Sequence, residues 1–538
     1  MALQSLILEI QMNTRKQVWA VLIVLAVSAV SWTMAQGQLP VSSTQAGSGL
    51  ASSAGIYDVR AFGARGDGAT VDTPAINRAI DAAAAAGGGT VRFPVGVYLC
   101  YSIHLKSKIS LYLDQGATIL AADTPQEGKG GYDPPEPNPW DKYQDFGHSH
   151  WHNSLIWGEE VQDVSILGPG LIHGKGLVRV GNPPPGAGNK SISLKNSRNI
   201  IIRDVSILHG GHFGILATGV DNLTIDNLKI DTNRDGIDID CCRHVVVSNC
   251  SVNSPYDDAI CPKSSYALGF ARATENVVIT NCIVSGYDEG TLLDGTYKRT
   301  VTYKAGPTGR IKFGTESNGG FKNITISNCV FNYCRGLALE TVDGGLLEDI
   351  AITNITMRDI ANNPIFLRLG SRMRGPEGTP VGNLRRVNIS NVVVYNADPR
   401  GGAIISGIPG HDIEDVKLSN IQIFYKGGGT KDQAALEPAE RENEYPEPNM
   451  FGDLPAYGFF IRHVKGIELS GIAISYLKED FRPAFFLDDV RGIDFDRLKA
   501  QHAADVPTFF LKKVEDFSLH QCKGLADTRL DRVDLKKF

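Results

Sequence analysis

The chain has 538 residues, more than one ordinary globular domain needs, which predicts two or three domains unless the chain is built from repeats. Its 53 Lys and Arg residues against 59 Asp and Glu residues give a formal net charge of −6, and the basic residues do not cluster in runs. This charge balance argues against nucleic acid as a partner. Hydrophobic residues make up 42% and charged residues 21% of the chain, which excludes a largely disordered protein.

The N-terminus has the pattern of a secretion signal. Arg15 and Lys16 precede an apolar run over residues 18–32, which small residues follow. We therefore expect residues 1–35 to be a signal peptide, residues 36–55 to be a flexible mature N-terminus, and the protein to be secreted or periplasmic. An uncleaved membrane anchor is the alternative. No later stretch has 18 consecutive apolar residues, so we expect no membrane contact after cleavage.

The nine cysteines are too few for a disulfide scaffold at this length, and the odd number leaves at least one unpaired. No C-x-x-C pair occurs, so a zinc ribbon or thioredoxin motif is not supported. Cys250, Cys282 and Cys329 each follow an Asn and precede an apolar residue or a Ser, a shared context that fits a buried structural row.

A short pattern of alternating apolar positions recurs along the chain. One copy begins at Arg198, the next at Asp221 and the next at Arg243, which gives spacings of 23 and 22 residues. Further copies begin at Glu275, Lys322, Glu348, Arg385, Glu414, Lys465, Arg491 and Glu515. Each copy holds short runs of period two, which indicate strands, and a repeat of this length with several strands indicates a solenoid.

No helical pattern lies between the copies, which excludes leucine-rich and βαβ repeats. The sequence therefore predicts an all-β fold, a single-stranded right-handed parallel β-helix whose coils stack at about 4.8 Å. An Asn that follows Ser or Thr in many copies is expected at the tight turn between two strands, because Asn adopts the left-handed conformation at little cost.

A solenoid needs a cap at its end, and a helix starting near Thr73 is expected to provide it. Thr73 is the expected N-cap, Pro74 fits the first turn, and the glycines at 87–89 end the helix. An apolar stripe is formed by Ile76, Ala79, Ile80 and Ala83. The remaining domain, residues 56–538, carries expected loop insertions at 123–160, 287–308 and 426–456.

Three aspartates repeat at the length of one coil. Asp235 and Asp257 are 22 residues apart, and Asp258 follows directly, so the carboxylates are expected to stack on one face. Inverting glycoside hydrolysis needs such a set, with one protonated acid and one base that holds a water. Asp257 and Asp258 would point to opposite faces of an ideal strand, so the strand must end or bulge there. Ordinary surface aspartates are the alternative.

At these residues the sequence resembles glycoside hydrolase family 28, the polygalacturonase and rhamnogalacturonase family. The resemblance rests on residues 57–68, the segment 87–94, the motif 233–236 and the pair Asp257–Asp258, and it covers roughly residues 56–480. It implies that Asp257 is the general acid and that Asp235 and Asp258 position and deprotonate the water. It also implies an inverting reaction on a pectic substrate with no metal and no cofactor.

The sequence departs from the family pattern at the substrate-binding positions. Arg234 replaces a Thr after Asn233, no His stands at 308–310, and Ala338 and Glu340 occupy the place of a basic pair. A literal Arg-Ile-Lys at 310–312 stands one repeat too early and is interpreted as an off-register match. Glu340 would face the carboxylate of a galacturonate with like charge, so these departures predict a rhamnogalacturonan-type or other modified pectic substrate. The expected substrate-binding set is Asn233, Arg234, Arg310, Lys312, Glu340 and Arg368.

Three alternating histidines, His148, His150 and His152, are compatible with metal binding, polar packing or substrate contact. Two other classes of function stay open. One is a pectate-type polysaccharide lyase that uses calcium and a basic residue. The other is a non-catalytic carbohydrate-binding solenoid, in which the aspartates are only surface charge. A monomer is expected.

Overall fold

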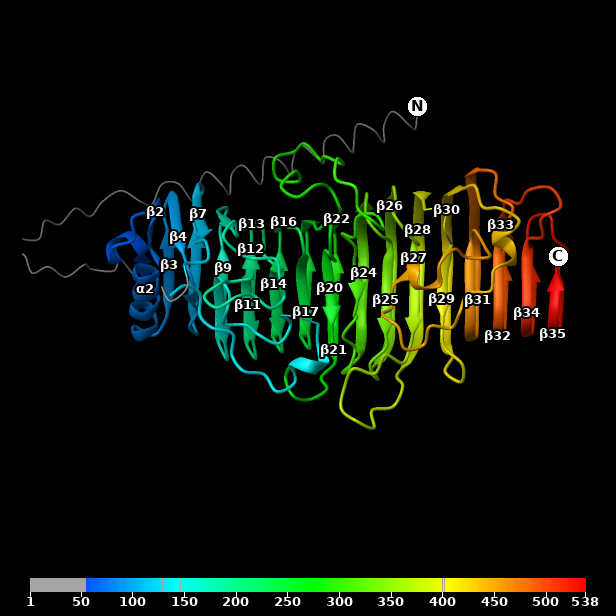
Figure 1. Ribbon diagram of the computed structural model, residues 1–538, viewed down its shortest axis with the longest axis horizontal. Helices are drawn as coiled ribbons and strands as arrows, with labels where there is room; N and C mark the ends of the chain where they lie inside the picture. Colours follow the sequence, from blue (N-terminus) through cyan, green and yellow to red (C-terminus); the bar gives the residue numbers. More distant parts are fainter. Residues whose placement is uncertain (1–54, 127–129, 146, 399, 401) are drawn as a thin grey trace, which may run out of the picture. The chain divides into compact units, whose positions relative to one another are not determined.

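The computed structural model describes residues 55–126, 130–145, 147–398, 400 and 402–538, which belong to one compact unit, residues 52–538. The expected signal peptide, residues 1–35, and nearly all of the expected flexible segment lie outside the described residues. The described part is a parallel β-helix, as the repeat predicted (Figure 1). Within it, no helix combines the length and the apolar character needed to cross a membrane.

The N-terminal half consists of short strands. In chain order the elements are β1 Ile56–Asp58, η1 Val59–Phe62, β2 Asp67–Val71, α2 Thr73–Ala85, β3 Gly89–Phe93, β4 Gly96–Cys100, β5 Ile103–His104, β6 Ile109–Leu113, β7 Ala117–Ala121, η2 Asp141–Tyr143, β8 Ile156–Glu159, β9 Gln162–Leu167, β10 Leu171–His173, β11 Lys190–Lys195, β12 Arg198–Arg203, β13 Ser206–Leu208, β14 Phe213–Thr218, β15 Asp221–Asp226, β16 Lys229–Asp231, β17 Asp235–Asp240, β18 Arg243–Ser248, β19 Ser251–Asn253, β20 Ile260–Lys263, β21 Thr274–Thr280 and β22 Ile283–Ser285.

In the C-terminal half, two strands of each coil often merge into one long strand. The elements are β23 Lys312–Phe313, β24 Phe321–Asn332, β25 Leu337–Thr341, β26 Leu346–Arg358, β27 Ile365–Leu369, β28 Asn383–Ala397, β29 Ala403–Ser406, β30 Ile413–Gly427, η3 Gln433–Ala435, η4 Pro448–Phe451, β31 Phe459–Lys478, β32 Phe485–Asp496, β33 Lys499–Ala500, β34 Phe509–His520 and β35 Thr528–Lys537.

Every predicted copy of the repeat pairs in parallel with the next copy in the same register. Ile200 lies beside Leu223, Leu223 beside Val245, and Val245 beside Val277, and all four side chains are buried in the core. A second sheet consists of β5, β8, β11, β14, β17 and β20. Because each coil adds one strand to each sheet, residues one coil apart lie side by side.

Asparagines mark the turn of many coils, as expected. Asn281, Asn328 and Asn354 have φ values of 56°, 55° and 58°, in the left-handed region. The Nδ2 atom of Asn354 donates to Oδ1 of Asn328 at 3.0 Å, and Asn328 Nδ2 donates to Asn281 Oδ1 at 3.3 Å. The turn residues therefore form a hydrogen-bonded ladder that fixes the register of the stack.

The first residues of the copies largely alternate in charge along the stack. Arg243 pairs in register with Glu275, Glu275 with Lys322, and Lys322 with Glu348. Arg243 Nε lies 2.9 Å from Glu275 Oε1, and Lys322 Nζ lies 3.8 Å from Glu348 Oε1. A slip of one coil would place like charges beside each other, so this column also favours the observed register.

Both ends of the solenoid are covered. Helix α2 caps the N-terminal end with the predicted stripe, which is buried. The N-cap is Asp72 rather than Thr73. The Asp72 carboxylate accepts hydrogen bonds from the backbone amides of Arg65 and Gly66, while Thr73 Oγ1 accepts one from Tyr101. At the other end β35 runs antiparallel to β34 and ends the parallel stack.

All nine cysteines are buried and none is in a disulfide. The Cys250, Cys282 and Cys329 thiols lie in the core on successive coils, as the shared sequence context predicted.

Candidate functional site

The three predicted acidic residues lie close together where β17 and β20, two neighbouring strands of the second sheet, begin. Asp235 is the first residue of β17, and Asp257 and Asp258 lie in the connection between β19 and β20. Because no strand runs through residues 257 and 258, their side chains are not forced to opposite faces. One carboxylate oxygen from each residue lies within 4.8 Å of the others, and Asp258 N donates to Asp235 Oδ1 at 3.1 Å.

Asp235 lies at the buried base of this cluster. Burial and the neighbouring Asp238 and Asp257 carboxylates raise the pKa of Asp235 well above its usual range. These surroundings favour the protonated form of the Asp235 carboxyl.

Asp258 has the opposite electrostatic environment. Arg310 Nε lies 2.9 Å from Asp258 Oδ1, and Lys312 Nζ lies 3.3 Å from Oδ2. Burial alone would raise the pKa of Asp258, but the charges of Lys312, Arg310 and Lys263 hold it well below its usual range. The pKa values of Asp235 and Asp258 are thus shifted in opposite directions by their surroundings.

Asp257 forms the exposed rim of the cluster. Arg234 Nη2 lies 2.8 Å from Asp257 Oδ2, and the two side chains are 35% and 25% exposed. Asn233 is buried beside them, and its carbonyl accepts from the backbone amide of Tyr256 at 3.1 Å. Arg234, which replaces the usual Thr, is therefore a partly accessible cation next to the expected general acid.

The coil count of the sequence places Arg310 and Lys312 one repeat before the expected basic pair, and the structure agrees. Ile311 bridges in parallel to Ile260, so their coil directly follows β20 and lies one repeat earlier than the expected basic pair. Both side chains nevertheless point to the acidic site, because they contact Asp258. The two cations belong to the site, and a substrate-binding role for them remains a prediction.

Glu340 occupies the coil after Lys312 and is fully buried. Its Oε2 atom lies 3.8 Å from Lys312 Nζ. Burial outweighs the attraction of Lys312 and Arg310 and raises the pKa of Glu340 to about 8. The expectation that Glu340 faces the substrate as an unbalanced negative charge is therefore wrong, since the side chain is enclosed and has a cationic neighbour.

Arg368 does not reach the acidic cluster, and the expectation that it binds substrate requires correction. Its guanidinium is buried and donates to Ser406 Oγ, to the Gly407 carbonyl and to the carbonyls of Glu440 and Arg441 at 2.9 to 3.0 Å. The side chain therefore anchors the connection between β30 and β31 to the solenoid.

That connection contributes two residues that sequence reasoning did not assign to the site. Glu447 bonds Arg310, and its other oxygen lies 3.1 Å from Arg335 Nη1. Tyr445 is half exposed, and its hydroxyl accepts a hydrogen bond from Lys312 Nζ at 3.4 Å. The composition of residues 426–456 suggested a wall beside the site, but no repeat spacing identifies which side chains reach it.

Asp238 and Lys263 were also missed. Asp238 is fully buried on β17, and Lys263 Nζ lies 3.9 Å from its Oδ2 and 3.4 Å from Glu316 Oε2. The alternation within β17 carried a usable signal, because residues 236, 238 and 240 share the face opposite the core isoleucines.

The three histidines have different surroundings. His148 is buried against the acidic cluster. His150 Nδ1 lies 2.8 Å from the Glu136 carbonyl, and the His152 ring stacks on Trp157 at 4.0 Å. His150 and His152 therefore serve polar packing, and only His148 approaches the predicted catalytic residues.

Three groups of side chains are close enough to hold a metal ion within the described ranges. They are His148, Asp235 and Asp238; Asp235, Asp257 and Asp258; and Asp412, His463 and Asp489. In the first two groups Arg234, Lys263, Arg310 and Lys312 already pair with the carboxylates. The negative charges of the acidic site are thus paired with Arg and Lys side chains, which reduces the attraction of the site for a metal ion.

The fold and this site define a parallel β-helix protein with a carboxylate centre of the glycosidase type. Residues 56–143 match the family description "Rhamnogalacturonase A/epimerase, pectate lyase-like", and residues 180–303 match "Right handed beta helix region". A probable polygalacturonase of Vitis vinifera is 24% identical over 436 residues, which cover 76% of this chain and 82% of the relative.

Solved structures show the same fold. A family 28 exopolygalacturonase of Yersinia enterocolitica superposes with a TM-score of 0.60 at 17% identity, over 83% of this chain and 79% of the other. An exopolygalacturonase of Thermotoga maritima gives a TM-score of 0.53 at 17% identity, over 90% and 95% of the two chains. The chain is thus similar in sequence to a probable polygalacturonase and shares the parallel β-helix fold of the two exopolygalacturonases.

Proposed function

We propose that the protein is a secreted, inverting hydrolase of galacturonate-containing pectic chains. The observation that carries the proposal is the carboxylate cluster, in which one oxygen each of Asp235, Asp257 and Asp258 lies within 4.8 Å of the others and Arg310 and Lys312 pair with Asp258. The Vitis relative, named a probable polygalacturonase, supports the substrate class. Secretion is supported by the signal pattern of residues 1–35.

In the proposed reaction, Asp258 and Asp235 hold the attacking water. The ionised Asp258 accepts a proton from the water, and Asp235 fixes its orientation. Asp257 lies at the exposed rim and donates a proton to the leaving glycosidic oxygen. Arg234 Nη2 lies 2.8 Å from Asp257 Oδ2 and is partly exposed, so it can also contact a carboxylate of the substrate beside the leaving group.

A modified, rhamnose-containing substrate is the finer prediction from the sequence, and it now has less support. That prediction depended on repulsion between Glu340 and a substrate carboxylate. Because Glu340 is enclosed beside Lys312, this repulsion no longer favours a neutral sugar. The partly exposed Arg234 instead offers a cation to a uronate.

A panel of polygalacturonate, galacturonate oligomers and rhamnogalacturonan oligomers tests the proposal. We expect saturated products from the galacturonate oligomers, with faster turnover than of rhamnogalacturonan, and no loss of activity with EDTA. Products that absorb ultraviolet light, with activity lost in EDTA and restored by calcium, would instead support a lyase. Binding of the oligomers without any product would support the non-catalytic alternative.

A further inference from the structure

His148 reaches the acidic cluster from outside the repeating coils. It lies in the connection between β7 and β8, is only 3% exposed, and its ring meets the Phe213 ring edge-on at 4.7 Å. Its Nε2 atom lies 3.3 Å from Asp238 Oδ2 and 4.0 Å from Asp235 Oδ2. An inserted segment thus places an imidazole against the residue expected to orient the water.

The other ring nitrogen indicates how the imidazole is protonated. His148 Nδ1 lies 3.1 Å from the Asp145 backbone carbonyl, which can only accept a hydrogen bond. Nδ1 therefore carries a hydrogen, and a second hydrogen on Nε2 makes the ring a cation that forms an ion pair with Asp238 at 3.3 Å. The surroundings raise the pKa of His148: burial and Lys263 act against the cation, but Glu316 and Asp238 outweigh them.

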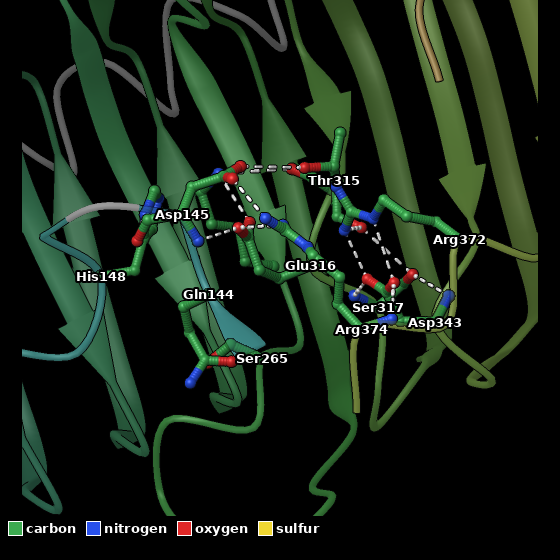
Figure 2. Close-up of polar contacts among 12 residues, drawn as sticks. Gln144, Asp145, His148, Ser265, Thr315, Glu316, Ser317, Asp343, Arg372 and Arg374 are labelled. Atoms are coloured by element: carbon green, nitrogen blue, oxygen red, sulfur yellow. Dashed lines mark hydrogen bonds and ion pairs between the residues drawn. The ribbon is translucent and has the colours of Figure 1, made fainter. Parts of the chain in front are cut away.

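A network of ion pairs holds the backbone that carries His148 (Figure 2). Asp145 N donates to Glu316 Oε1 at 2.9 Å, and Arg374 Nη2 lies 3.0 Å from the same oxygen. Arg374 Nη1 also pairs with the Asp145 carboxylate. Asp343 in turn accepts from Arg374 N at 3.0 Å, so the network joins the β7–β8 connection to the residues that follow β27.

The charges around His148 come from every element that packs against it. They are Asp235, Asp238 and Asp240 on β17, Lys263 on β20, Glu316 after β23, His212 before β14, and Arg374 after β27. Asp238 has cationic partners in His148 and Lys263. Loss of the imidazole would remove one of the two and leave a buried carboxylate under-compensated.

We propose that His148 is a positioning residue of the hydrolytic site, which orients and charge-balances the Asp235–Asp238 pair beneath the reacting glycoside. This inference rests on the proposed function. The contacts of His148 at the site are to Asp238 at 3.3 Å and Asp235 at 4.0 Å, so it acts through the two aspartates and not on the substrate. The β7–β8 connection thereby completes a site that the repeating coils do not form alone.

The variants His148→Gln and His148→Ala distinguish the polar contact of His148 with Asp238 from its positive charge. A Gln amide can still donate to Asp238, whereas Ala removes the contact. Loss of a positive charge strengthens proton binding by the interacting carboxyls of the site, including the base Asp258 beside Asp235, so the acidic limb of the kcat–pH profile is expected to move to higher pH by about one unit in both variants. His148→Ala is also expected to lose roughly tenfold to hundredfold in kcat, with part of that loss rescued in His148→Gln.

His150→Gln is the matched control, because His150 belongs to the same segment but contacts Glu136 and Asp141. We expect it to keep the wild-type profile. An unchanged acidic limb in His148→Gln, or an equal shift in His150→Gln, would overturn the proposal.

A stability measurement keeps the inference distinct from the proposed function. A histidine whose pKa is raised by folding stabilises the fold at low pH, and this contribution is lost as the pH rises through the folded-state pKa. His148→Gln should therefore lower the urea midpoint more at pH 5 than at pH 9. Failure of the wild-type protein to hydrolyse any oligomer would reject the proposed function, whereas an equal midpoint change at both pH values would reject the charge-balancing role of His148.

Discussion

Arg234 Nη2 lies 2.8 Å from Asp257 Oδ2 at the exposed rim of the carboxylate cluster, where the family pattern has a threonine before the first aspartate. This ion pair joins the most accessible cation of the site to the expected general acid. Arg234 is therefore placed to contact an anionic sugar directly beside Asp257.

Replacement of Arg234 by Thr should raise KM for galacturonate oligomers roughly tenfold to hundredfold, since a hydrogen bond to a charged group contributes about 1.5–3 kcal/mol. Turnover of reduced, carboxyl-free oligomers should change much less. Steady-state kinetics on the two substrates measure the difference. An equal loss on both would place Arg234 outside uronate recognition.

Replacement of each of the three aspartates by Asn should change the free energy of unfolding by different amounts. Each variant should lose about 10²- to 10⁴-fold in kcat, the usual contribution of acid or base catalysis. Asp235→Asn and Asp257→Asn should unfold close to the wild type, because one carboxyl is already protonated and the other is exposed. Asp258→Asn should cost about 3–5 kcal/mol, because it leaves the buried Arg310 and Lys312 without their shared partner.

Calorimetric melting of the three Asn variants, alongside their kinetics, measures this pattern. Full activity in both Asp257→Asn and Asp258→Asn would end the carboxylate mechanism. Equal melting temperatures for all three would contradict the buried ion pairs at Asp258.

Arg368 should act on the site only through the segment that it anchors. Arg368→Ala removes the hydrogen bonds to the carbonyls of Gly407, Glu440 and Arg441, of which Gly407 keeps Ser406 Oγ as a donor, so we expect a total loss of about 1–3 kcal/mol. We expect a lower melting temperature and faster proteolysis within residues 426–456. A stable variant that only gains a higher KM would show that Arg368 contacts substrate after all.

Glu340 should make the protein less stable at alkaline pH. Its folded-state pKa of about 8 lies above the unfolded value, so stability is lost as the pH rises from the unfolded pKa through the folded one. Glu340→Gln resembles the protonated form and should stabilise the protein at pH 9 more than at pH 5. Urea unfolding at the two pH values tests this, and a larger gain at pH 5 would indicate that Glu340 is ionised in its pair with Lys312.

The fold was largely predictable because the β-helix repeats its local pattern. The spacing from Arg198 to Asp221 and Arg243 gives the strands, and the same spacing brings Asp235 to Asp257 and Asp258. Asn turns such as Asn328 follow from one residue's preference for the left-handed conformation.

The remainder of the site was not predictable from this periodicity. His148, Tyr445 and Glu447 arrive on long connections whose path depends on tertiary ion pairs, and no coil spacing relates them to Asp258. Counting coils located Arg310 correctly, but it did not show that the side chain pairs with Asp258. Both strand alternation and burial decide what a charged residue contacts, and only alternation is visible in the sequence.

The central claim is that the Asp235–Asp257–Asp258 cluster hydrolyses galacturonate-containing chains. The most direct test incubates a galacturonate oligomer in oxygen-18-labelled water and follows the products by mass spectrometry and ultraviolet absorbance. The account predicts one labelled oxygen at each new reducing end, no new absorbance, and no labelled product from Asp258→Asn. Unlabelled products that absorb ultraviolet light, or labelled products formed equally well by Asp258→Asn, would contradict it.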